Sequence, residues 1–528
     1  MLPPEAAVKE SAGASPIEAG SARWVRGLMI LLLLAAAAAL RLQSLARKPF
    51  WFDECFSTVV AGIDWRKFLH LLWWREANMS LYYVLLRAWL DLSPNFGQSE
   101  FFIRSLSVLI AVATLPALYW LARLLYNARV ALIATALLAF NAYHVRYAQE
   151  ARTYALFVLL ATLSSGFLIA SLREPSRRYR VGYIVCSILA VYAHFYALLL
   201  VLAHCLTLRW FGSPRPNGDQ RNAARSSEMQ RAWTIIGIAV LPLLIFVAKT
   251  GAGPIRWIPR ATRHDLLVFY ENFCGSNRWP LGAVFAVACL AAVVPVAKQL
   301  FARDHSWETW RCQFLLVWLL FPIVLTVLLS FARPVFLARY MIFCLPALVI
   351  LVAAGLARLR QSWLLAVVLT GILFLSSQGI FFVYGHDFDT ERDASGAASN
   401  FILDHTEPGD GVVFHIPATR VAYEFFRSVR AGENTASPAC KVSLGPEILF
   451  PHHATGLDYR DFTGKPTADF LQTLAMGHPR VWVMLMNNGS PASPDPTTVM
   501  LTKALSESFP KVQTWQLARV EVRLYSKQ

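Results

Sequence analysis

Residues 181–208, VGYIVCSILAVYAHFYALLLVLAHCLTL, run for 28 positions without an Asp, Glu, Lys or Arg. A helix that crosses a membrane needs about 20 apolar residues, so this stretch is long for one crossing and short for two. Arginines flank it on both sides, within residues 173–180 and 209–231. Positive charge favours the cytoplasmic side of a membrane, so we expect both flanks there. The stretch therefore predicts two membrane helices that turn near His194.

The composition extends this interpretation to the whole chain. Of 528 residues, 56% are hydrophobic and 16% are charged, and the mean hydropathy is +0.45. Soluble domains carry about 25% charged residues, so a soluble enzyme is excluded. The sequence predicts a polytopic α-helical membrane protein with about 11 crossings, within a range of about 10 to 13. Besides the hairpin, the expected crossings lie near residues 24–46, 101–124, 129–145, 153–172, 232–249, 280–300, 312–331, 337–356 and 362–384.

The net charge of +16 is distributed unevenly along the chain. Residues 1–384 hold 36 Lys and Arg against 17 Asp and Glu, whereas residues 385–528 hold 13 against 16. The basic part is also the apolar part, so we expect its charge in membrane-flanking loops and around bound anionic groups. Membrane lipid is thus an expected partner, and nucleic acid is not.

This shift in composition predicts three regions. Residues 1–22, rich in Ala, Ser, Pro and Glu, form a disordered cytoplasmic tail. Residues 23–385 form the membrane module, and its first outer loop, 46–100, holds interfacial helices such as 81–92, which is too short to span. Residues 386–528 form an α/β domain. Its expected strands include Gly411–Phe414, Val481–Leu485 and Leu517–Tyr525.

An odd number of crossings puts the two ends of the chain on opposite sides of the membrane. With the N-terminus in the cytoplasm, the loops 46–100 and 144–152 and the C-terminal domain all lie outside. Basic loops such as 123–129 and 298–311 then fall inside, as the positive-inside rule requires. The outer loops are where we expect the chemistry, because polar clusters gather there.

The first polar cluster is WFDECFS, residues 51–57, just past the first membrane helix. Asp53 and Glu54 are adjacent carboxylates in an aromatic surrounding at the membrane boundary. Such groups are costly to desolvate, which makes a functional role more frequent than for an average acidic residue. A helix cap or a solvated turn is the alternative.

The second cluster is HVRYAQEARTY, residues 144–154. On a continuous helix, Arg146 and Glu150 would stand four apart and form an ordinary salt bridge. That pair leaves Arg152 and the neighbouring polar side chains unexplained. Two guanidiniums beside hydrogen-bonding groups suit a phosphate, because the planar fork of arginine matches phosphate oxygens.

A third candidate is Arg339, followed by Tyr340, at the outer end of a late crossing. An arginine at a helix end often only reaches for the lipid headgroups with its long side chain. Its expected position on the outer side also allows it to act with the arginines of the second cluster.

Taken together, these motifs resemble a known enzyme group. The order WFDE at 51–54, LYYVLLRAW at 81–89, Arg104-Ser105 and YAQEARTY at 147–154 is similar to the GT-C glycosyltransferases of the protein O-mannosyltransferase and aminoarabinose transferase type, families 39 and 83. The similarity covers about residues 24–385 and is sharpest from 50 to 160. Family members often have His-Pro-Pro before the Leu-Tyr-Tyr, where this chain has Asn-Met-Ser.

The resemblance implies an inverting membrane enzyme. Such an enzyme moves a sugar from a polyprenyl phosphate to an acceptor on the outer face of a bacterial-type cytoplasmic membrane, where the acceptor is lipid A or lipopolysaccharide, another glycolipid, or a protein. Asp53 is then the expected base, with Glu54 beside it. No organic cofactor is needed, and a divalent cation is possible. Expected phosphate ligands are Arg146, Arg152 and Arg339. Expected substrate contacts are Tyr82, Tyr83, Tyr147, Gln149, Glu150 and Tyr340.

Other classes of protein remain open from the residues alone. A transporter or flippase for lipid-linked sugars also has many crossings and an arginine-lined cavity, although transporters tend to carry inverted repeats, which are not evident here. An O-antigen ligase or polymerase would share the donor but not the early Asp-Glu loop. A scaffold whose outer domain binds a partner is a further alternative.

Overall fold

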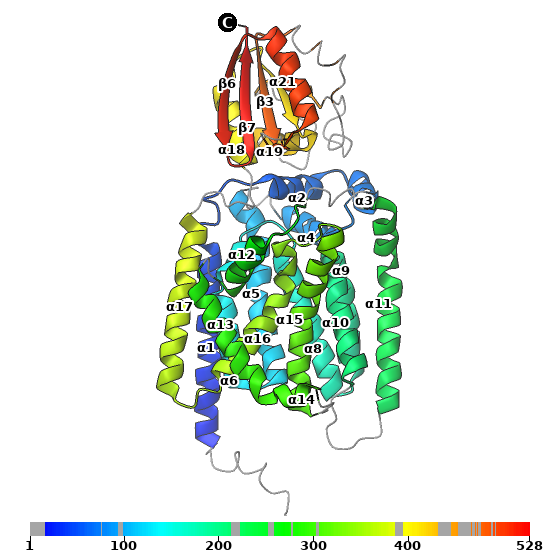
Figure 1. The fold of residues 1–528 in the computed structure, drawn as a ribbon, viewed down its shortest axis with the longest axis vertical. Helices are drawn as coiled ribbons and strands as arrows, with labels where there is room; N and C mark the ends of the chain where they lie inside the picture. The colour runs from blue at the N-terminus through cyan, green and yellow to red at the C-terminus, as the bar shows by residue number, and fades with distance from the viewer. Residues whose placement is uncertain are drawn as a thin grey trace, which may run out of the picture.

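The computed structural model describes residues 16–527 apart from several gaps, and it consists of a long helical bundle and a C-terminal α/β domain stacked on one end (Figure 1). The first helix, α1 (Pro16–Leu42), begins inside the segment 1–22 that was expected to be disordered. The apolar part of α1 that could cross a membrane begins at Trp24. The gaps are residue 75 and residues 93–98, 213–221, 252–257, 276–277, 302–305, 386–393, 431–444, 452–465, 467–469, 471–472, 474–476, 487–488 and 491–492.

Among the described residues, eight helices are long and apolar enough to cross a membrane, or nine if one bent pair counts as a single span. The expected crossings outside the hairpin and the bent pair are all found as helices. They are α1, α5 (Glu100–Leu125), α8 (Tyr154–Arg173), α11 (Asn222–Thr250), α13 (Trp279–Val293) with η3 (Val294–Val296) and α14 (Ala297–Phe301), α15 (Trp307–Ala332), η4 (Ala338–Cys344) with α16 (Leu345–Leu356), and α17 (Ser362–Gly385).

The hairpin predicted within residues 181–208 is present. It consists of α9 (Arg177–Ala193) and α10 (Ala197–Trp210), with a turn at residues 194–196. The two helices have 17 and 14 residues, which is short for a full crossing. This shortness is one reason why a count by helix length falls below the expected eleven.

The crossing expected at 129–145 is instead two helices, α6 (Ala128–Ala139) and α7 (Ala142–Ala148), bent by 60°. The Asn141 side chain starts α7 by accepting a hydrogen bond from the His144 N–H at 2.9 Å. Arg41 donates to the carbonyl oxygen of Ala139 at 3.0 Å and so satisfies the end of α6. The bend brings α7 across the end of the bundle.

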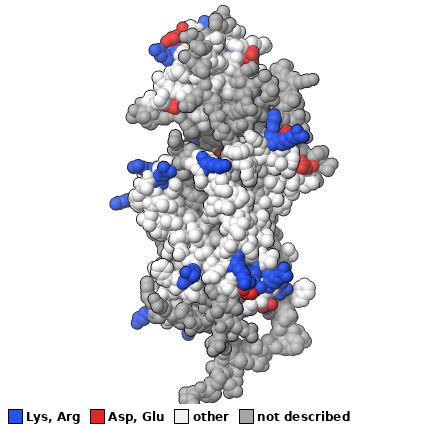
Figure 2. All heavy atoms as spheres, turned by 90° about the vertical axis from the view of Figure 1, so that its right-hand side faces the viewer, with Lys and Arg blue, Asp and Glu red and all other residues white. Residues whose placement is uncertain are grey.

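The surface of the bundle matches a membrane environment. Figure 2 shows Lys and Arg side chains at two levels, near the two ends of the helical body, and a largely uncharged band between them. Large apolar side chains on the outer helices, such as Ile238 of α11 and Val287 of α13, are 67% exposed. An apolar belt between two basic rims is typical of a chain that crosses the bilayer many times. The protein is a multi-pass membrane protein.

Short helices cover the end of the bundle next to the C-terminal domain (Figure 1). They are α2 (Phe52–Gly62), α3 (Trp65–Trp74), α4 (Ser80–Leu90) and α12 (Arg263–Cys274). The expected interfacial helix at 81–92 corresponds to α4, which buries Tyr82, Tyr83 and Leu86 against the bundle. The first loop is therefore a packed layer of helices.

The C-terminal domain is built on a five-stranded sheet of order β2-β1-β3-β7-β6. Strand β1 runs parallel to β2 and β3, whereas β3, β7 and β6 are antiparallel. The strand expected at 517–525 is present from Val520, whereas Leu517 ends the preceding strand, because the chain turns at Arg519 with a φ of 58°. The strands are β1 (Gly411–His415), β2 (Glu447–Phe450), β3 (Arg480–Met486), β6 (Lys511–Leu517) and β7 (Val520–Ser526), with the small pair β4 (Gly489–Ser490) and β5 (Ser493–Pro494). The helices are α18 (Ser395–His405), η5 (Pro417–Thr419), α19 (Arg420–Arg430) and α21 (Pro496–Ser508).

The two parts of the protein meet at α2. Helix α19 packs against α2, and the ring of Phe425 stacks on Phe50 with centroids 5.3 Å apart. A Cβ atom on Gly396 would lie 2.5 Å from the Phe50 carbonyl oxygen, so the contact tolerates no side chain there. The domain therefore rests on the segment that leads into Asp53.

Candidate active site

Two arginines from distant parts of the chain converge on Asp53. Asp53 lies in the first turn of α2, and its Oδ2 is 3.4 Å from Nη2 of Arg152 and 3.9 Å from Nη2 of Arg339. Arg152 follows α7, and Arg339 lies in η4. One carboxylate thus faces two guanidiniums at distances longer than a strong hydrogen bond, and these three groups together carry a net positive charge.

Arg152 is fixed by several contacts. It is 6% exposed and donates hydrogen bonds to the Asp53 carbonyl oxygen at 3.3 Å and to the Ser57 hydroxyl at 3.0 Å. Burial by itself lowers the pKa of Arg152, but the Asp53 carboxylate and the hydroxyls of Tyr83 and Tyr154 together raise it above its usual value. Arg152 is therefore a permanent cation. Arg339 lies over the Trp51 ring at 5.5 Å.

Glu54 points away from this pair and serves a different purpose. Both of its oxygens bind Arg104, with distances of 2.7 Å to Nε and 2.6 Å to Nη2, and the Ala151 N–H donates to it at 2.9 Å. Glu54 is fully buried. These contacts join α2, α5 and the loop that carries Arg152, so Glu54 holds these three segments in place around the site.

Glu76 belongs to the site, although the sequence reasoning did not select it. It lies between α3 and α4. Burial raises the pKa of Glu76 to about 7, the positive charge of Arg152 opposes that increase, and the charge of Asp53 adds to it. The signal in the sequence was a further acidic residue in the loop of Asp53, five residues before Leu81.

The adjacent tyrosines Tyr82 and Tyr83 have different surroundings. Burial raises the pKa of Tyr83, and the charges of Arg152, Glu76 and Asp53 also act on it, so its protonated hydroxyl lies at the site. Tyr82 instead shares a hydrogen bond with Ser107 at 2.9 Å, inside the bundle. Of this pair, only Tyr83 joins the candidate site.

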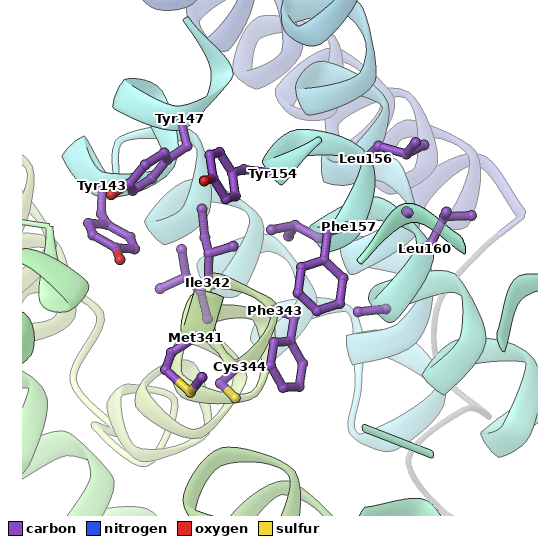
Figure 3. Close-up of a cluster of buried hydrophobic side chains, with 14 of the residues drawn as sticks. Tyr143, Tyr147, Tyr154, Leu156, Phe157, Leu160, Met341, Ile342, Phe343 and Cys344 are labelled. Carbon is purple, nitrogen blue, oxygen red and sulfur yellow. The ribbon is translucent and has the colours of Figure 1, made fainter. Parts of the chain in front are cut away.

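An aromatic layer lines the side of the site next to α8. Figure 3 shows Tyr147 and Tyr154 facing each other, with ring centroids 5.0 Å apart. Tyr154 is a further residue that the sequence reasoning did not select, and it lies near the charges of Arg152 and Arg339. Tyr340 lies beside the same cations.

The remaining expected residues lie around this centre. Helix α7 ends at Ala148, so Arg146 and Glu150 do not lie on one continuous helix. Arg146 lies over the Tyr147 ring at 5.1 Å, one ring away from Tyr154. The Gln149 amide donates to the carbonyl oxygens of Arg41 and Gln43, at 3.0 and 2.8 Å, and Glu150 is buried. Gln149 therefore ties the loop to the end of α1.

The segment Asn78–Ser80, which precedes Leu81, contacts the turn between α9 and α10. The Asn78 side chain accepts a hydrogen bond from the Phe195 N–H at 3.1 Å, and the Ser80 hydroxyl donates to the Tyr192 carbonyl at 3.3 Å. Met79 between them adopts a left-handed φ of 66°. The segment holds the turn between α9 and α10 against the first loop.

Buried polar atoms around the two cations stand without a hydrogen-bond partner among the residues that the structure describes. Native proteins pair nearly all such groups with protein, water or ligand. Their concentration beside an excess of positive charge indicates a site that binds a polar anion. The atoms are Trp51 Nε1, Arg152 Nε, Tyr154 OH and His194 Nε2.

Comparisons with known proteins agree with this picture. Residues 84–245 match the family model described as dolichyl-phosphate-mannose-protein mannosyltransferase. No curated protein sequence matched the chain. Among solved structures, ArnT from Cupriavidus metallidurans in the apo state is similar with a TM-score of 0.60 and 13% identity, covering 96% of this chain and 99% of that one.

Two further structures are similar at low identity. ArnT from the same organism bound to undecaprenyl phosphate has a TM-score of 0.53 and 13% identity, covering 94% of this chain and 97% of that one. The oligosaccharyltransferase AglB from Archaeoglobus fulgidus, in complex with an inhibitory peptide and a dolichol-phosphate, has a TM-score of 0.52 and 10% identity, with 88% and 69% covered. The chain therefore has the fold of these structures, the GT-C fold, and its residues 84–245 are similar to the dolichyl-phosphate-mannose-protein mannosyltransferase family.

Proposed function

We propose that the protein transfers a sugar from a polyprenyl phosphate carrier to an acceptor hydroxyl or amine, with inversion at the anomeric carbon. The observation that carries this proposal is the single carboxylate of Asp53 between the buried guanidiniums of Arg152 and Arg339. A base and a phosphate-binding pair in one place are what the reaction needs.

The reaction follows from that geometry. The acceptor oxygen or nitrogen attacks C1 of the sugar as its proton passes to the Asp53 carboxylate. The bond between C1 and the phosphate oxygen breaks on the opposite face, and the phosphate leaves with the electron pair. Arg152 and Arg339 stabilise the charge that develops on the phosphate, through a transition state of oxocarbenium character. The products are the glycosylated acceptor and the free polyprenyl phosphate.

The other expected phosphate ligand, Arg146, has a secondary place in this scheme. Its guanidinium lies over the Tyr147 ring, and Tyr147 packs on Tyr154. We assign Arg146 to the wall of the site and Tyr83, Tyr154 and Tyr340 to substrate contact. Glu54 positions α2 through Arg104 and takes no proton, because its two oxygens are already occupied.

A divalent cation has few ligands here. Asp53 and Glu76 are two neighbouring carboxylates, and among the described residues no group of three or more His, Cys, Asp or Glu side chains could hold a metal. Such a cation would take most of its coordination shell from water and phosphate oxygens. One solved relative of the fold, an Archaeoglobus fulgidus oligosaccharyltransferase, was crystallised with Zn and sulfate. The described side chains do not make a metal site by themselves, so no step is assigned to a metal.

We place the reaction on the outer face of a bacterial-type cytoplasmic membrane. The loop of Asp53 and the C-terminal domain share one end of the bundle (Figure 1), and the basic flanks of α9 and α10 belong to the other side by the positive-inside rule. Helix α19 of the C-terminal domain packs against α2, the helix that carries Asp53, which suits recognition of a glycolipid or protein acceptor.

The test uses the purified full-length protein and a panel of polyprenyl phosphate sugars. Transfer or slow hydrolysis of one donor is expected, and Asp53→Asn is expected to reduce its rate by roughly 10²- to 10⁴-fold, the contribution of a general base. Donor binding should persist in that variant. Asp64→Asn, in the same loop at the exposed start of α3, is the matched control.

Two results would contradict the proposal. Near-normal turnover of Asp53→Asn would remove Asp53 from the role of base. Facilitated movement of an intact lipid-linked sugar across vesicles, without cleavage of the bond to phosphate, would favour a flippase instead.

A further inference from the structure

His194 is a buried histidine with one ring nitrogen in use and one without a partner. It lies in the turn between α9 and α10 and is 1% exposed. Its Nδ1 is 3.2 Å from the Tyr196 N–H, which donates to it. The Nδ1 atom is therefore an acceptor, and the proton of the neutral ring is on Nε2. That Nε2 is buried and has no hydrogen-bond partner among the described residues.

The ring cannot easily turn to find another partner. It stacks on Phe157 with centroids 4.9 Å apart and an angle of 4°, and the Tyr340 ring meets it at 4.7 Å. Figure 3 shows Phe157 in turn against Phe343 of η4. The Tyr196 hydroxyl donates to the Val335 carbonyl oxygen, which fixes the turn itself. The direction of the Nε2–H is thus set by the fold.

Two cations stand near this ring. Burial, together with the positive charges of Arg152 and Arg339, lowers the pKa of His194 to about 3. The ionisable groups that face this part of the site are those two arginines, Asp53 between them, and the hydroxyls of Tyr340 and Tyr196. His194 therefore stays neutral at physiological pH and adds an N–H donor without adding a third positive charge.

We propose that the Nε2–H of His194 donates a hydrogen bond to a non-bridging oxygen of the donor phosphate that Arg152 and Arg339 hold. This inference rests on the proposed function and names a ligand of the same site. The three groups come from three separate elements, and a phosphate offers enough oxygens for all of them. A neutral donor fixes the orientation of the phosphate, and it leaves the charge of the site to the arginines.

The experiment measures binding of undecaprenyl phosphate to the purified full-length protein in detergent. His194→Phe keeps a flat ring against Phe157 but removes the donor, and we expect a loss of affinity of roughly 10- to 100-fold, as for one hydrogen bond to a charged group. His194→Gln places an amide N–H near the Nε2 position and should restore most of the affinity. His194→Asn places its amide near Nδ1 and should not.

His204→Phe is the matched control, because His204 is also fully buried in the bundle and bonds Ser165 at 3.1 Å. It should bind the lipid like the wild type. All affinities are compared at one pH, with the unfolding temperature of each variant measured alongside. A purely structural role for His194 would lower unfolding temperature and affinity together in the Phe, Gln and Asn variants.

Three outcomes would overturn the inference. One is an unchanged affinity in His194→Phe. Another is equal affinity of the Gln and Asn variants. The third is a ratio of wild-type to Phe-variant affinity that rises as the pH falls from 8 to 5.5, which would mean that His194 binds as a cation. Failure of the wild type itself to bind undecaprenyl phosphate would instead refute the proposed function, and this inference with it.

Discussion

Asp53 Oδ2 lies 3.4 Å from Arg152 Nη2, although the two residues are 99 positions apart in the sequence. The contact joins the first turn of α2 to the loop after α7. Next to it, Glu54 and Arg104 join α2 to α5. Two neighbouring carboxylates thus contact two different arginines, one in the candidate active site and one in the supporting structure.

The two arginines of the candidate active site, Arg152 and Arg339, are expected to act on the donor phosphate. Arg152→Ala or Arg339→Ala should lower kcat/KM for the lipid donor by roughly 10²-fold, the scale of losing one charge-stabilising donor group. Lysine at either position should recover part of this loss, because it keeps the charge but not the planar fork. Steady-state kinetics with varied donor concentration measures both effects.

The control for this prediction is Arg358→Ala. Arg358 follows α16, at the opposite end of that helix from Arg339, and is exposed. Its removal should leave donor kinetics unchanged. Equal effects of Arg358→Ala and Arg339→Ala would contradict the assignment of the phosphate to the Asp53 end of the bundle.

Glu54 is expected to matter for stability more than for proton transfer. Glu54→Gln leaves the buried Arg104 without its anionic partner, and breaking a buried ion pair in this way costs about 3–5 kcal/mol. The unfolding temperature in detergent should fall clearly below that of the wild type. Asp53→Asn, whose side chain is 20% exposed, should unfold close to the wild type. The reverse order of the two unfolding temperatures would refute this division of roles.

Glu76 is expected to make donor binding depend on pH. With a pKa of about 7, its carboxyl is neutral in mild acid and becomes negative as the pH rises through that value. A negative Glu76 beside Arg152 competes with the phosphate, so the donor KM should rise above about pH 7. A sugar phosphodiester keeps a single negative charge over this range, so the ligand does not cause the change.

Glu76→Gln should flatten this pH profile and keep the donor KM low from pH 6 to 8.5. Glu308→Gln, at the start of α15 and 62% exposed in its side chain, serves as the control and should follow the wild type. A profile of Glu76→Gln that still rises above pH 7 would show that another group titrates.

The contact between the two domains is expected to influence the rate. Phe425→Ala removes the ring that stacks on Phe50. The Arg104 guanidinium lies over the same Phe50 ring, 4.7 Å from its centroid. Small displacements of α2 move the Asp53 carboxylate, so kcat should fall by roughly 10-fold while the donor KM changes little.

Phe401→Ala is the matched control for Phe425→Ala. Phe401 packs on Trp515 inside the C-terminal domain, with centroids 5.0 Å apart, and its ring contacts lie within that domain. It should reduce stability without the selective loss of kcat. Identical kinetics for the two variants would indicate that the domain contributes only stability.

The architecture could be predicted from the sequence, because membrane helices are recognised by the length and hydropathy of their segments. The hairpin with a turn at His194 and the interfacial helix α4 came from counting apolar residues between charged ones. The bend between α6 and α7 could not be predicted in this way. It depends on the side chain of Asn141 and on Arg41 of α1, which donates a hydrogen bond to the end of α6. Such a long-range contact leaves no local pattern.

The candidate site was anticipated in part. The acidic pair, the arginine of the loop after α7 and the late Arg339 were all chosen from the sequence, since charged residues at a membrane boundary are rare and costly. Their separate roles were not visible. Adjacent residues on a helix point about 100° apart, so Asp53 and Glu54 face different neighbours, and only the packing of α5 and η4 decides which neighbour each one meets.

What the sequence by itself determined is thus the membrane module, the α/β domain and the kinds of charged group available at one end. What only the tertiary structure decided is which of them meet: Asp53 with Arg152 and Arg339, Glu54 with Arg104, and Glu76 and His194 beside the cations. Hydropathy is a property of each segment alone. Electrostatic interaction between side chains depends on their distance, and that distance is fixed only when the helices pack.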